Sequence, residues 1–285
     1  DQIALLSGLD VWHTQPLPDA GVRSVMLSDG PHGLRKQEVG GDHLGTTGSK
    51  PATCFPPAVT LASSWDPALL HEVGAALGRE AAAEGVAVVL GPGLNIKRHP
   101  HCGRNFEYLS EDPLVAGRLA AAMVEGIQSQ GVGACLKHFA VNNQEAHRLV
   151  VDAVVDERTL RELYLAGFEH AVTQSRPWTI MAAYNAVNGT FCTDHHRLLT
   201  SILRDEWGFD GLVMSDWGAT NDRVAGVHAG MDLEMPGSGG VSDGDVAAAV
   251  ASGKLAAEAR RFRSRVAIVP NGAQEAVGLE QMSLG

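Results

Sequence analysis

The sequence predicts an α/β fold of the (β/α)8 barrel type, TIM-barrel-like, with an incomplete or atypical last unit. Short, almost entirely apolar runs alternate along the chain with amphipathic stretches of helical length. Such runs are typical of parallel strands that helices cover on both faces. There are about seven of these strand–helix steps, and no GxGxxG sequence opens them, which favours a closed barrel over an open dinucleotide-binding sheet.

The size and composition of the chain agree with a single barrel. Its length of 285 residues lies close to the size of about 250 that one such barrel routinely uses. Hydrophobic residues make up 45% and charged residues 19%, which excludes a disordered chain. The formal charge of −11 comes without a basic stripe, so we expect no nucleic-acid partner. The sequence contains no apolar run of about 18 residues, so no membrane span is predicted.

The expected elements follow from apolar runs and from helix-start signals. Predicted strands occupy residues 25–28, 58–62, 86–90, 132–136, 178–183, 212–215 and 231–235, with a shorter strand-like stretch at 149–155. Predicted helices occupy residues 66–84, 112–130, 156–173, 194–207, 222–229 and 245–251. Aspartates such as Asp66, Asp112, Asp156 and Asp194 stand where N-caps are expected, and Pro67 and Pro113 follow two of them.

Polar residues stand where several predicted strands end. These residues are Asp29, Lys137, His138, Tyr184 and Asp216. The carboxyl ends of barrel strands converge on one face, where active sites are built. We therefore expect these side chains to lie together, and Arg104, in the polar loop at 91–111, to reach the same face.

Asp216 is the candidate nucleophile. A carboxylate at a barrel rim beside an aromatic residue suits attack on an anomeric carbon, and a retaining glycosidase pairs it with a second acid about 5–5.5 Å away. The indole of Trp217 would pack on the sugar's C–H surface. The alternative is that Asp216 only caps the next helix.

The other candidates suit sugar binding. Asp29 stands in a rigid turn where its carboxylate can accept two hydroxyl hydrogen bonds; the alternative is an Asx-turn. Lys137 and His138 are adjacent, so one of them should face away from the barrel interior unless the chain turns there. A Lys137 cation beside Asp29 or Asp216 would keep the nucleophile ionised. The alternatives are a solvated lysine with a packed histidine, or a Schiff-base amine as in aldolases.

Arg104 has a planar fork that suits bidentate contact with hydroxyls or a carboxylate, although a loop-bracing ion pair with Glu107 or Glu111 is the alternative. The nearby histidines and Cys102 match no zinc spacing, so we expect no metal. Tyr184 is expected to donate a hydrogen bond to the nucleophile, although an ordinary interior tyrosine is the alternative. The four cysteines show no CxxC pairing and read as structural thiols, with a disulfide left open.

Four motifs, in this order along the chain, resemble glycoside hydrolase family 3 in its β-glucosidase branch. They are SDGPHGLR at 28–35, GRNFEYLSEDP at 103–113, KHFAVNNQE at 137–145 and VMSDW at 213–217. The resemblance covers residues 1–255 and implies the N-terminal barrel domain of a larger enzyme. Residues 256–285 are expected to form an atypical C-terminal tail without a second domain. The chain starts without Met and shows no signal peptide, so its compartment stays open, as does its oligomeric state.

The resemblance also implies an activity and a site. The enzyme would release terminal non-reducing β-D-glucosyl residues from small β-glucosides or oligosaccharides, without a cofactor, through an intermediate on Asp216. Arg35 would contribute to the sugar pocket from its loop, while Glu107 and Glu145 would brace Arg104 and Lys137. The remaining implied roles are sugar binding by Asp29, Arg104, Lys137 and His138, and lining of the subsite by Tyr184 and Trp217.

The acid/base residue has no candidate in this sequence. The family's β-N-acetylhexosaminidase branch carries a Pro-Gly-His loop after Lys-His-Phe, and here the sequence AVNNQE stands at 140–145 instead. The β-glucosidase branch takes its acid from a downstream domain. We therefore expect a truncated form without the acid/base. The alternative is a non-catalytic sugar-binding remnant.

Overall fold

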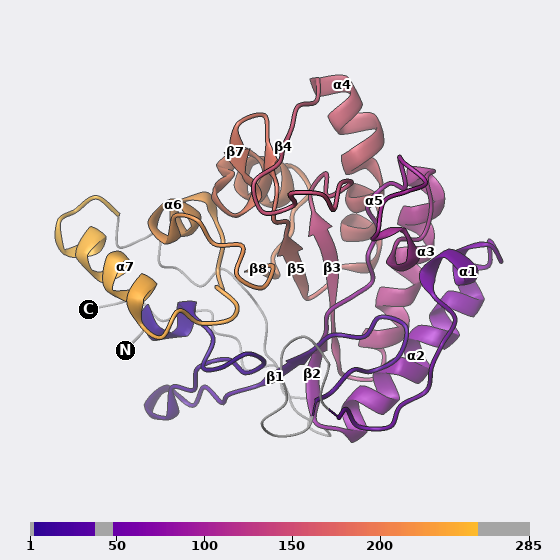
Figure 1. The fold of residues 1–285 in the computed structure, drawn as a ribbon. Coiled ribbons are helices and arrows are strands. Elements are labelled where there is room, and N and C mark those ends of the chain that lie inside the picture. Colours follow the sequence, from indigo (N-terminus) through magenta and orange to yellow (C-terminus); the bar gives the residue numbers. More distant parts are fainter. Residues whose placement is uncertain (1–2, 38–47, 256–285) are drawn as a thin grey trace.

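The computed structural model describes residues 3–37 and 48–255 (Figure 1). Five strands form one parallel sheet in the order β1 (Met26–Ser28), β2 (Val86–Val89), β3 (Gly133–Phe139), β5 (Thr179–Ala182) and β8 (Leu212–Ser215). The sheet curls, and helices cover its outer face. This arrangement confirms the expected TIM-barrel-like α/β fold with an incomplete set of regular strands.

Single bridges, rather than further strands, complete the circuit from β8 back to β1. Leu233 pairs in parallel with Met214 of β8, and Glu234 pairs in parallel with Ser7. The following bridges, Gly8 with Thr14 and His13 with Met26, are antiparallel and return to β1. The last predicted strand, residues 231–235, is therefore present as bridged backbone and not as a regular strand. The two ends of the described chain meet here.

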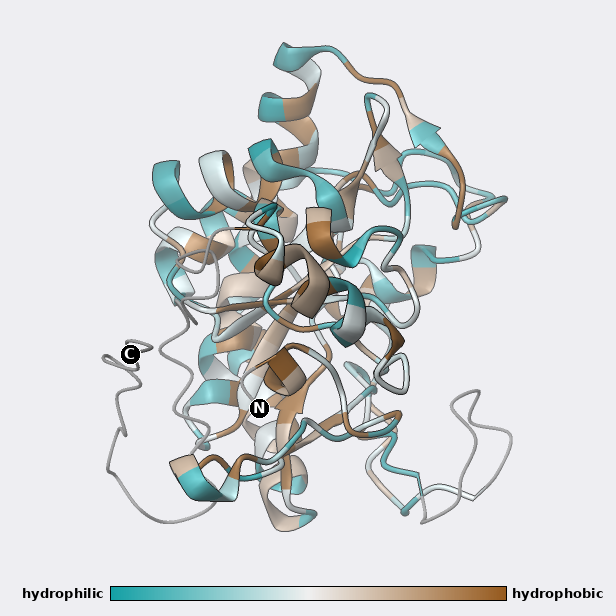
Figure 2. Ribbon diagram, turned by 90° about the vertical axis from the view of Figure 1, so that its left-hand side faces the viewer, coloured by the Kyte–Doolittle hydropathy of each residue, from teal (hydrophilic) through white to brown (hydrophobic). Residues whose placement is uncertain are grey.

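The sheet separates two apolar cores, because its side chains alternate between the inside and the outside of the curl. The inner cluster contains Leu27, Val88, Leu90, Cys135, Met181, Leu212, Met214, Leu233 and Met235. A larger outer cluster joins the strands to the helices. In Figure 2, hydrophobic segments gather at the centre of the molecule and hydrophilic ones at its periphery. Packing in these two cores holds the strands, and therefore the residues at their carboxyl ends, in place.

The helices α2 (Pro67–Ala83), α3 (Pro113–Gln128) and α5 (Ala166–Ser175) cover one side of the sheet (Figure 1). Asp66 and Asp112 accept backbone hydrogen bonds at the starts of α2 and α3, as predicted. The helices α2 and α3 approach closely at two glycines. A Cβ at Gly74 would lie 2.5 Å from the carbonyl oxygen of Met123, and one at Gly126 would lie 2.2 Å from that of His71. Only glycine fits at these contacts.

The remaining elements surround the sheet. Asp156 caps α4 (Glu157–Thr159), as predicted, and a π-helical stretch, Leu160–Leu165, joins α4 to α5. A small sheet contains β4 (Asp152–Ala153), β6 (Ala186–Val187) and β7 (Thr190–Phe191). A second π-helical stretch, Arg197–Glu206, precedes β8, and α6 (Arg223–Ala229) and α7 (Val241–Ala251) follow it. Short 3-10 turns lie at Ile3–Leu6, Pro18–Ala20, Asn105–Glu107 and Cys192–Asp194.

Three further details of the predicted elements were wrong. The apolar run at 58–62 is helix α1 (Ala58–Ala62) and not a strand, because Ala58, Leu61 and Ala62 are buried at helical spacing while Val59 is exposed. Asp194 lies in a 3-10 turn and does not cap the following helix. The last helix, α7, begins at 241 rather than at 245.

The expected tail at 256–285 lies outside the described residues. Within the described part of the chain, no helix is both long and apolar enough to cross a membrane. All four cysteines are free thiols, and Cys135 and Cys192 are buried.

Candidate active site

The parallel strands place the predicted site residues at one edge of the sheet. Asp29 directly follows β1, and Lys137 and His138 lie near the carboxyl end of β3. Tyr184 follows β5 by two residues, and Asp216 directly follows β8. Asp216 is not a helix cap, since Asp222 caps α6.

Asp29 connects two cations. Its Oδ1 lies 3.1 Å from the Nζ of Lys137, and its Oδ2 accepts a 2.9 Å hydrogen bond from Nη2 of Arg35. Burial opposes the charged form of Asp29, but Lys137 and Arg35 outweigh it, so the pKa of this carboxyl lies below its usual value. The turn therefore holds an ionised carboxylate whose partners come from β3 and from its own loop.

Glu107 extends this network to Arg104. Its Oε2 lies 3.6 Å from the Nζ of Lys137, and its Oε1 accepts a hydrogen bond from the Nε of Arg104. The loop-bracing pair that was an alternative for Arg104 therefore exists. Arg104 also reaches further, because its Nη2 lies 3.0 Å from the Nε2 of His138 and its Nη1 lies 3.5 Å from Glu145.

Lys137 and His138 both face the site although they are neighbours on one strand. Their side chains are 5% and 1% exposed. The register of β3 against β5 shifts between Leu136 and Phe139, and such an irregularity re-aims side chains. The sequence allowed both side chains to face the site only if the chain turned here, and this irregularity meets that condition. Asn95 holds this stretch, because its side chain donates to the His138 carbonyl at 2.8 Å and accepts from the His138 N–H at 2.7 Å.

Lys137 is held as a cation. Burial disfavours its charge, but Asp29 and Glu107 outweigh that effect and raise its pKa above the usual value. A Schiff-base mechanism needs a neutral amine. The ion pairs of Lys137 therefore oppose the aldolase-type alternative.

Asp216 has one satisfied and one unsatisfied oxygen. Its Oδ1 accepts a 2.7 Å hydrogen bond from the backbone N–H of Trp217. Its Oδ2 is buried without a hydrogen-bond partner among the described residues and lies 3.5 Å from the Nε2 of His138. The side chain is 10% exposed. Burial raises the pKa of Asp216 above its usual value, although Lys137 and Arg104 oppose the rise.

Tyr184 and Trp217 lie beside this carboxylate. The Tyr184 hydroxyl donates to the Trp217 carbonyl at 2.9 Å. It also interacts with the Asp216 carboxylate, as the sequence suggested, and this interaction helps to lower the pKa of Asp216. Burial and the Asp216 charge raise the pKa of Tyr184. The Trp217 indole N–H donates to the Val11 carbonyl at 2.7 Å. The ring of Trp12 lies 5.5 Å from that of Trp217. The side chains of Tyr184 and Trp217 therefore adjoin the candidate nucleophile, and Trp12 packs against Trp217.

All eight candidate residues belong to one continuous set of contacts, with Glu107 as the connection between its Lys137 and Arg104 parts. Sequence reasoning assigned no role to Asn95, Tyr108 and Trp12. Tyr108 lies inside the motif at 103–113, which is a signal that could have indicated it. Asn95 and Trp12 carry no such signal, because only the folded chain brings them to the site.

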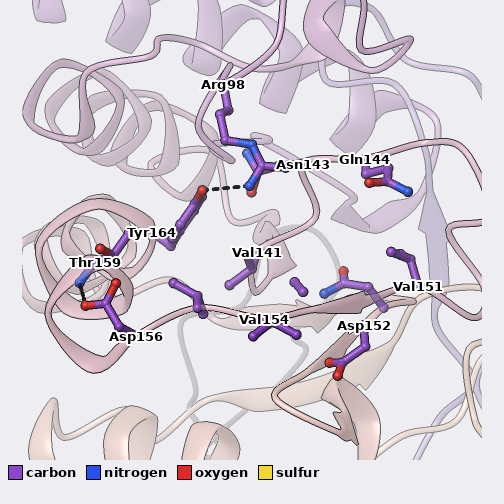
Figure 3. Close-up of a pocket in the computed structure, with 13 residues that line it drawn as sticks. Arg98, Val141, Asn143, Gln144, Val151, Asp152, Val154, Asp156, Thr159 and Tyr164 are labelled. Carbon is purple, nitrogen blue, oxygen red and sulfur yellow. Dashed lines mark hydrogen bonds between the residues drawn. The ribbon is translucent and has the colours of Figure 1, made fainter.

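A separate cavity of about 340 Å³ lies beside the small sheet (Figure 3). Arg98, Tyr164 and Asp152 are among its lining residues, and Arg98 donates to the Tyr164 hydroxyl at 3.0 Å. None of the eight candidate residues lines it. We therefore keep the candidate active site at the strand ends. Within the described ranges, no cluster of three or more His, Cys, Asp or Glu side chains could hold a metal ion.

Comparison with known proteins agrees with these motifs. The model of the glycosyl hydrolase family 3 N-terminal domain matches residues 36–269. The chain belongs to glycosyl hydrolase family 3. The chain is similar to thermostable beta-glucosidase B of Acetivibrio thermocellus, with 58% identity over 90% of this chain and 34% of that relative.

Two further proteins broaden the comparison. An exo-alpha-(1->6)-L-arabinopyranosidase of Bifidobacterium longum is 54% identical over 90% of this chain and 34% of its own length. The structure of beta-glucosidase 3B from Thermotoga neapolitana in complex with glucose superposes with a TM-score of 0.86 at 43% identity, covering 92% of this chain and 40% of that one. The chain thus spans about a third of the length of the curated relatives it matches.

Proposed function

We propose that this family 3 domain carries the nucleophile and the sugar pocket of a retaining β-glucosidase, with Asp216 as the nucleophile. The observation that supports it best is the buried, unpartnered Oδ2 of Asp216, next to a network of hydrogen-bonding cations. In most native sites a buried carboxylate oxygen has a donor. One without a donor retains its lone pairs for a reacting atom.

In the first step the Asp216 carboxylate attacks the anomeric carbon. A new ester bond forms between them while the bond from that carbon to the aglycone oxygen breaks, and the aglycone leaves with the bonding electrons. Lys137 and Arg104, both near Asp216, favour its ionised form. Water then cleaves the ester and releases the sugar with its original configuration.

The sugar hydroxyls would be held by the remaining polar side chains. Asp29 can accept hydroxyl hydrogen bonds as an ionised carboxylate, and charge-assisted bonds of this kind are strong. Arg35, Arg104 and Lys137 offer donors. His138 adds a ring that the surrounding contacts hold in place. Tyr184 and Trp217 would exclude water from the reacting bond.

Proton donation to the leaving aglycone is the part that this network does not supply. Two other carboxylates of this network, Glu107 and Glu145, are both paired with Arg104. The third, Asp29, is paired with Lys137 and Arg35. Aglycones that leave easily as anions do not need a general acid in the first step. The proposal therefore predicts that glucosides of acidic phenols react with Asp216 faster than alkyl glucosides do.

Mass spectrometry after incubation with 2-deoxy-2-fluoro-β-D-glucosyl fluoride tests the nucleophile. Fluoride leaves, the ester forms, and the electron-withdrawing 2-fluoro group slows its hydrolysis. We expect one added fluoroglucosyl group on the peptide that contains Asp216, and none in the Asp216→Asn variant. Folded wild-type protein that stays unlabelled, or that is labelled elsewhere, would refute the assignment. Glucose binding without labelling would support the sugar-binding remnant instead.

The sugar specificity needs its own comparison, because a relative named as an L-arabinopyranosidase is 54% identical. The p-nitrophenyl β-D-glucopyranoside and α-L-arabinopyranoside should be compared at equal concentration. We expect faster p-nitrophenol release from the glucoside. If the arabinopyranoside is preferred, Asp216 remains the proposed nucleophile, but the proposed β-glucoside specificity is wrong.

A further inference from the structure

Tyr108 contacts the site although it contributes no reactive group. It is 1% exposed and comes from the loop that also carries Arg104 and Glu107. Its hydroxyl oxygen lies 3.0 Å from the Nδ1 of His138, and Asn142 donates to the same oxygen at 3.1 Å. Tyr108 therefore sits behind the imidazole ring, on the side away from Asp216.

The other ring nitrogen of His138 faces two charged groups. Nη2 of Arg104 lies 3.0 Å from Nε2, and Oδ2 of Asp216 lies 3.5 Å from it. An N–H at Nε2 would place two donors against each other at the shorter contact, since a guanidinium has no acceptor. A lone pair at Nε2 accepts the Arg104 N–H. Because the Arg104 contact is the shorter of the two, it favours a lone pair at Nε2, and the hydrogen of a neutral ring then lies on Nδ1, facing Tyr108.

We propose that Tyr108 is a positioning residue that holds His138 as the neutral tautomer with hydrogen on Nδ1. The Nδ1–H donates to the Tyr108 oxygen, which Asn142 also holds, and Nε2 accepts from Arg104. In this state Arg104 is fixed beside the sugar pocket. His138 donates nothing to Asp216, so the Oδ2 of Asp216 stays without a donor. This inference rests on the proposed function for its catalytic consequence, but not for the tautomer itself.

The charges around the ring agree with a neutral imidazole. Burial and the cations Arg104, Lys137 and Arg148 lower the pKa of His138 well below its usual value. The anionic Asp216 also faces the ring but lies on the longer contact. An imidazolium would carry hydrogen on both nitrogens and would lose its acceptor role toward Arg104.

Nitrogen-15 NMR of the full chain with labelled histidine reads the tautomer directly, because protonated and unprotonated ring nitrogens have distinct shifts. A His138→Gln variant assigns the signal. We expect a protonated Nδ1 and an unprotonated Nε2 in the wild type, and a shift toward protonated Nε2 in Tyr108→Phe. The matched control is Tyr164→Phe, since Tyr164 also has a buried ring whose hydroxyl accepts from an arginine, Arg98, away from the site. It should leave the His138 signal unchanged.

The kinetic readout compares the wild type, Tyr108→Phe and Tyr164→Phe on an activated aryl glucoside. We expect Tyr108→Phe to lower kcat/KM by about tenfold, the equivalent of one hydrogen bond, and to move the acid limb to lower pH as Nε2–H donates to Asp216. Protonated Nε2 in the wild type, or an unchanged His138 signal in Tyr108→Phe, overturns the inference. A correct tautomer shift in protein that the fluoroglucoside does not label refutes the proposed function and leaves the tautomer assignment standing.

Discussion

Asp216 and Asp232 are two largely buried aspartates beside β8, and their hydrogen bonding differs. Their side chains are 10% and 13% exposed. The Oδ2 of Asp232 accepts from Arg204 at 2.6 Å and from the Val213 N–H at 2.8 Å. The Oδ2 of Asp216 accepts from no described group. Burial raises the pKa of both carboxyls, so burial alone does not distinguish a structural carboxylate from a reactive one.

The difference shows what each carboxylate is suited to do. Asp232 and Arg204 fix the backbone around β8, because Arg204 also donates to the Gly211 and Gly230 carbonyls. Asp216 leaves lone pairs unused at a cost in stability, and such local inconsistencies concentrate at functional sites. The comparison therefore predicts that substitution of Asp216 abolishes activity, whereas substitution of Asp232 lowers the stability of the fold.

Asp216→Asn should give the largest effect. Loss of the nucleophile should reduce aryl glucoside turnover by at least about a thousandfold. Burial disfavours the charged carboxylate of Asp216, and the asparagine side chain is neutral. The melting temperature of the variant at neutral pH should therefore equal or exceed that of the wild type. Turnover assays and thermal unfolding measure both. Substantial remaining turnover would remove Asp216 from the catalytic role, and a lower melting temperature would contradict the cost in stability that is assigned to its buried charge.

Asp232→Asn should show the opposite pattern. It leaves the buried Arg204 without its anion, and breaking such a pair costs about 3 kcal/mol of unfolding free energy. Urea denaturation measures the loss. Labelling of the remaining folded protein by the fluoroglucoside should continue. If labelling stops while the fold is intact, the division between the two aspartates is wrong.

The pH dependence of labelling should reflect the Asp216 carboxyl. Only the ionised form attacks, so the rate should fall as the pH falls through its raised pKa, by about tenfold per pH unit. This acid limb should lie above the usual aspartate value of 3.8. Asp29, whose pKa is lowered, should stay ionised through the same range. A limb at or below 3.8 would contradict the burial of Asp216.

Arg204→Lys should have the smallest effect of the set. The charge next to Asp232 remains, but a lysine cannot also reach the Gly211 and Gly230 carbonyls with a planar fork. We expect a loss of about 1 kcal/mol, the net value of a hydrogen bond, measured by the same denaturation. A loss equal to that of Asp232→Asn would show that the fork, and not the charge, stabilises this region.

Local sequence signals were sufficient for most of the fold. The strand at 212–215 was predicted with its observed ends, and Asp66 and Asp112 begin their helices as the capping pattern indicates. The run at 58–62 was misassigned because five apolar or small residues fit either a strand or one helical turn and a half. Its burial at 58, 61 and 62 depends on what packs against it.

The sequence by itself determined most of the elements and the positions of the candidate residues at strand ends, because apolar periodicity and capping act over a few residues. Only the tertiary structure decided that Asp216 keeps a bare oxygen while Asp232 does not, and that Asn95 and Tyr108 hold His138. The physical reason is that hydrogen-bond partners and burial come from strands and loops far apart in the chain. No local pattern of residues encodes which of them meet.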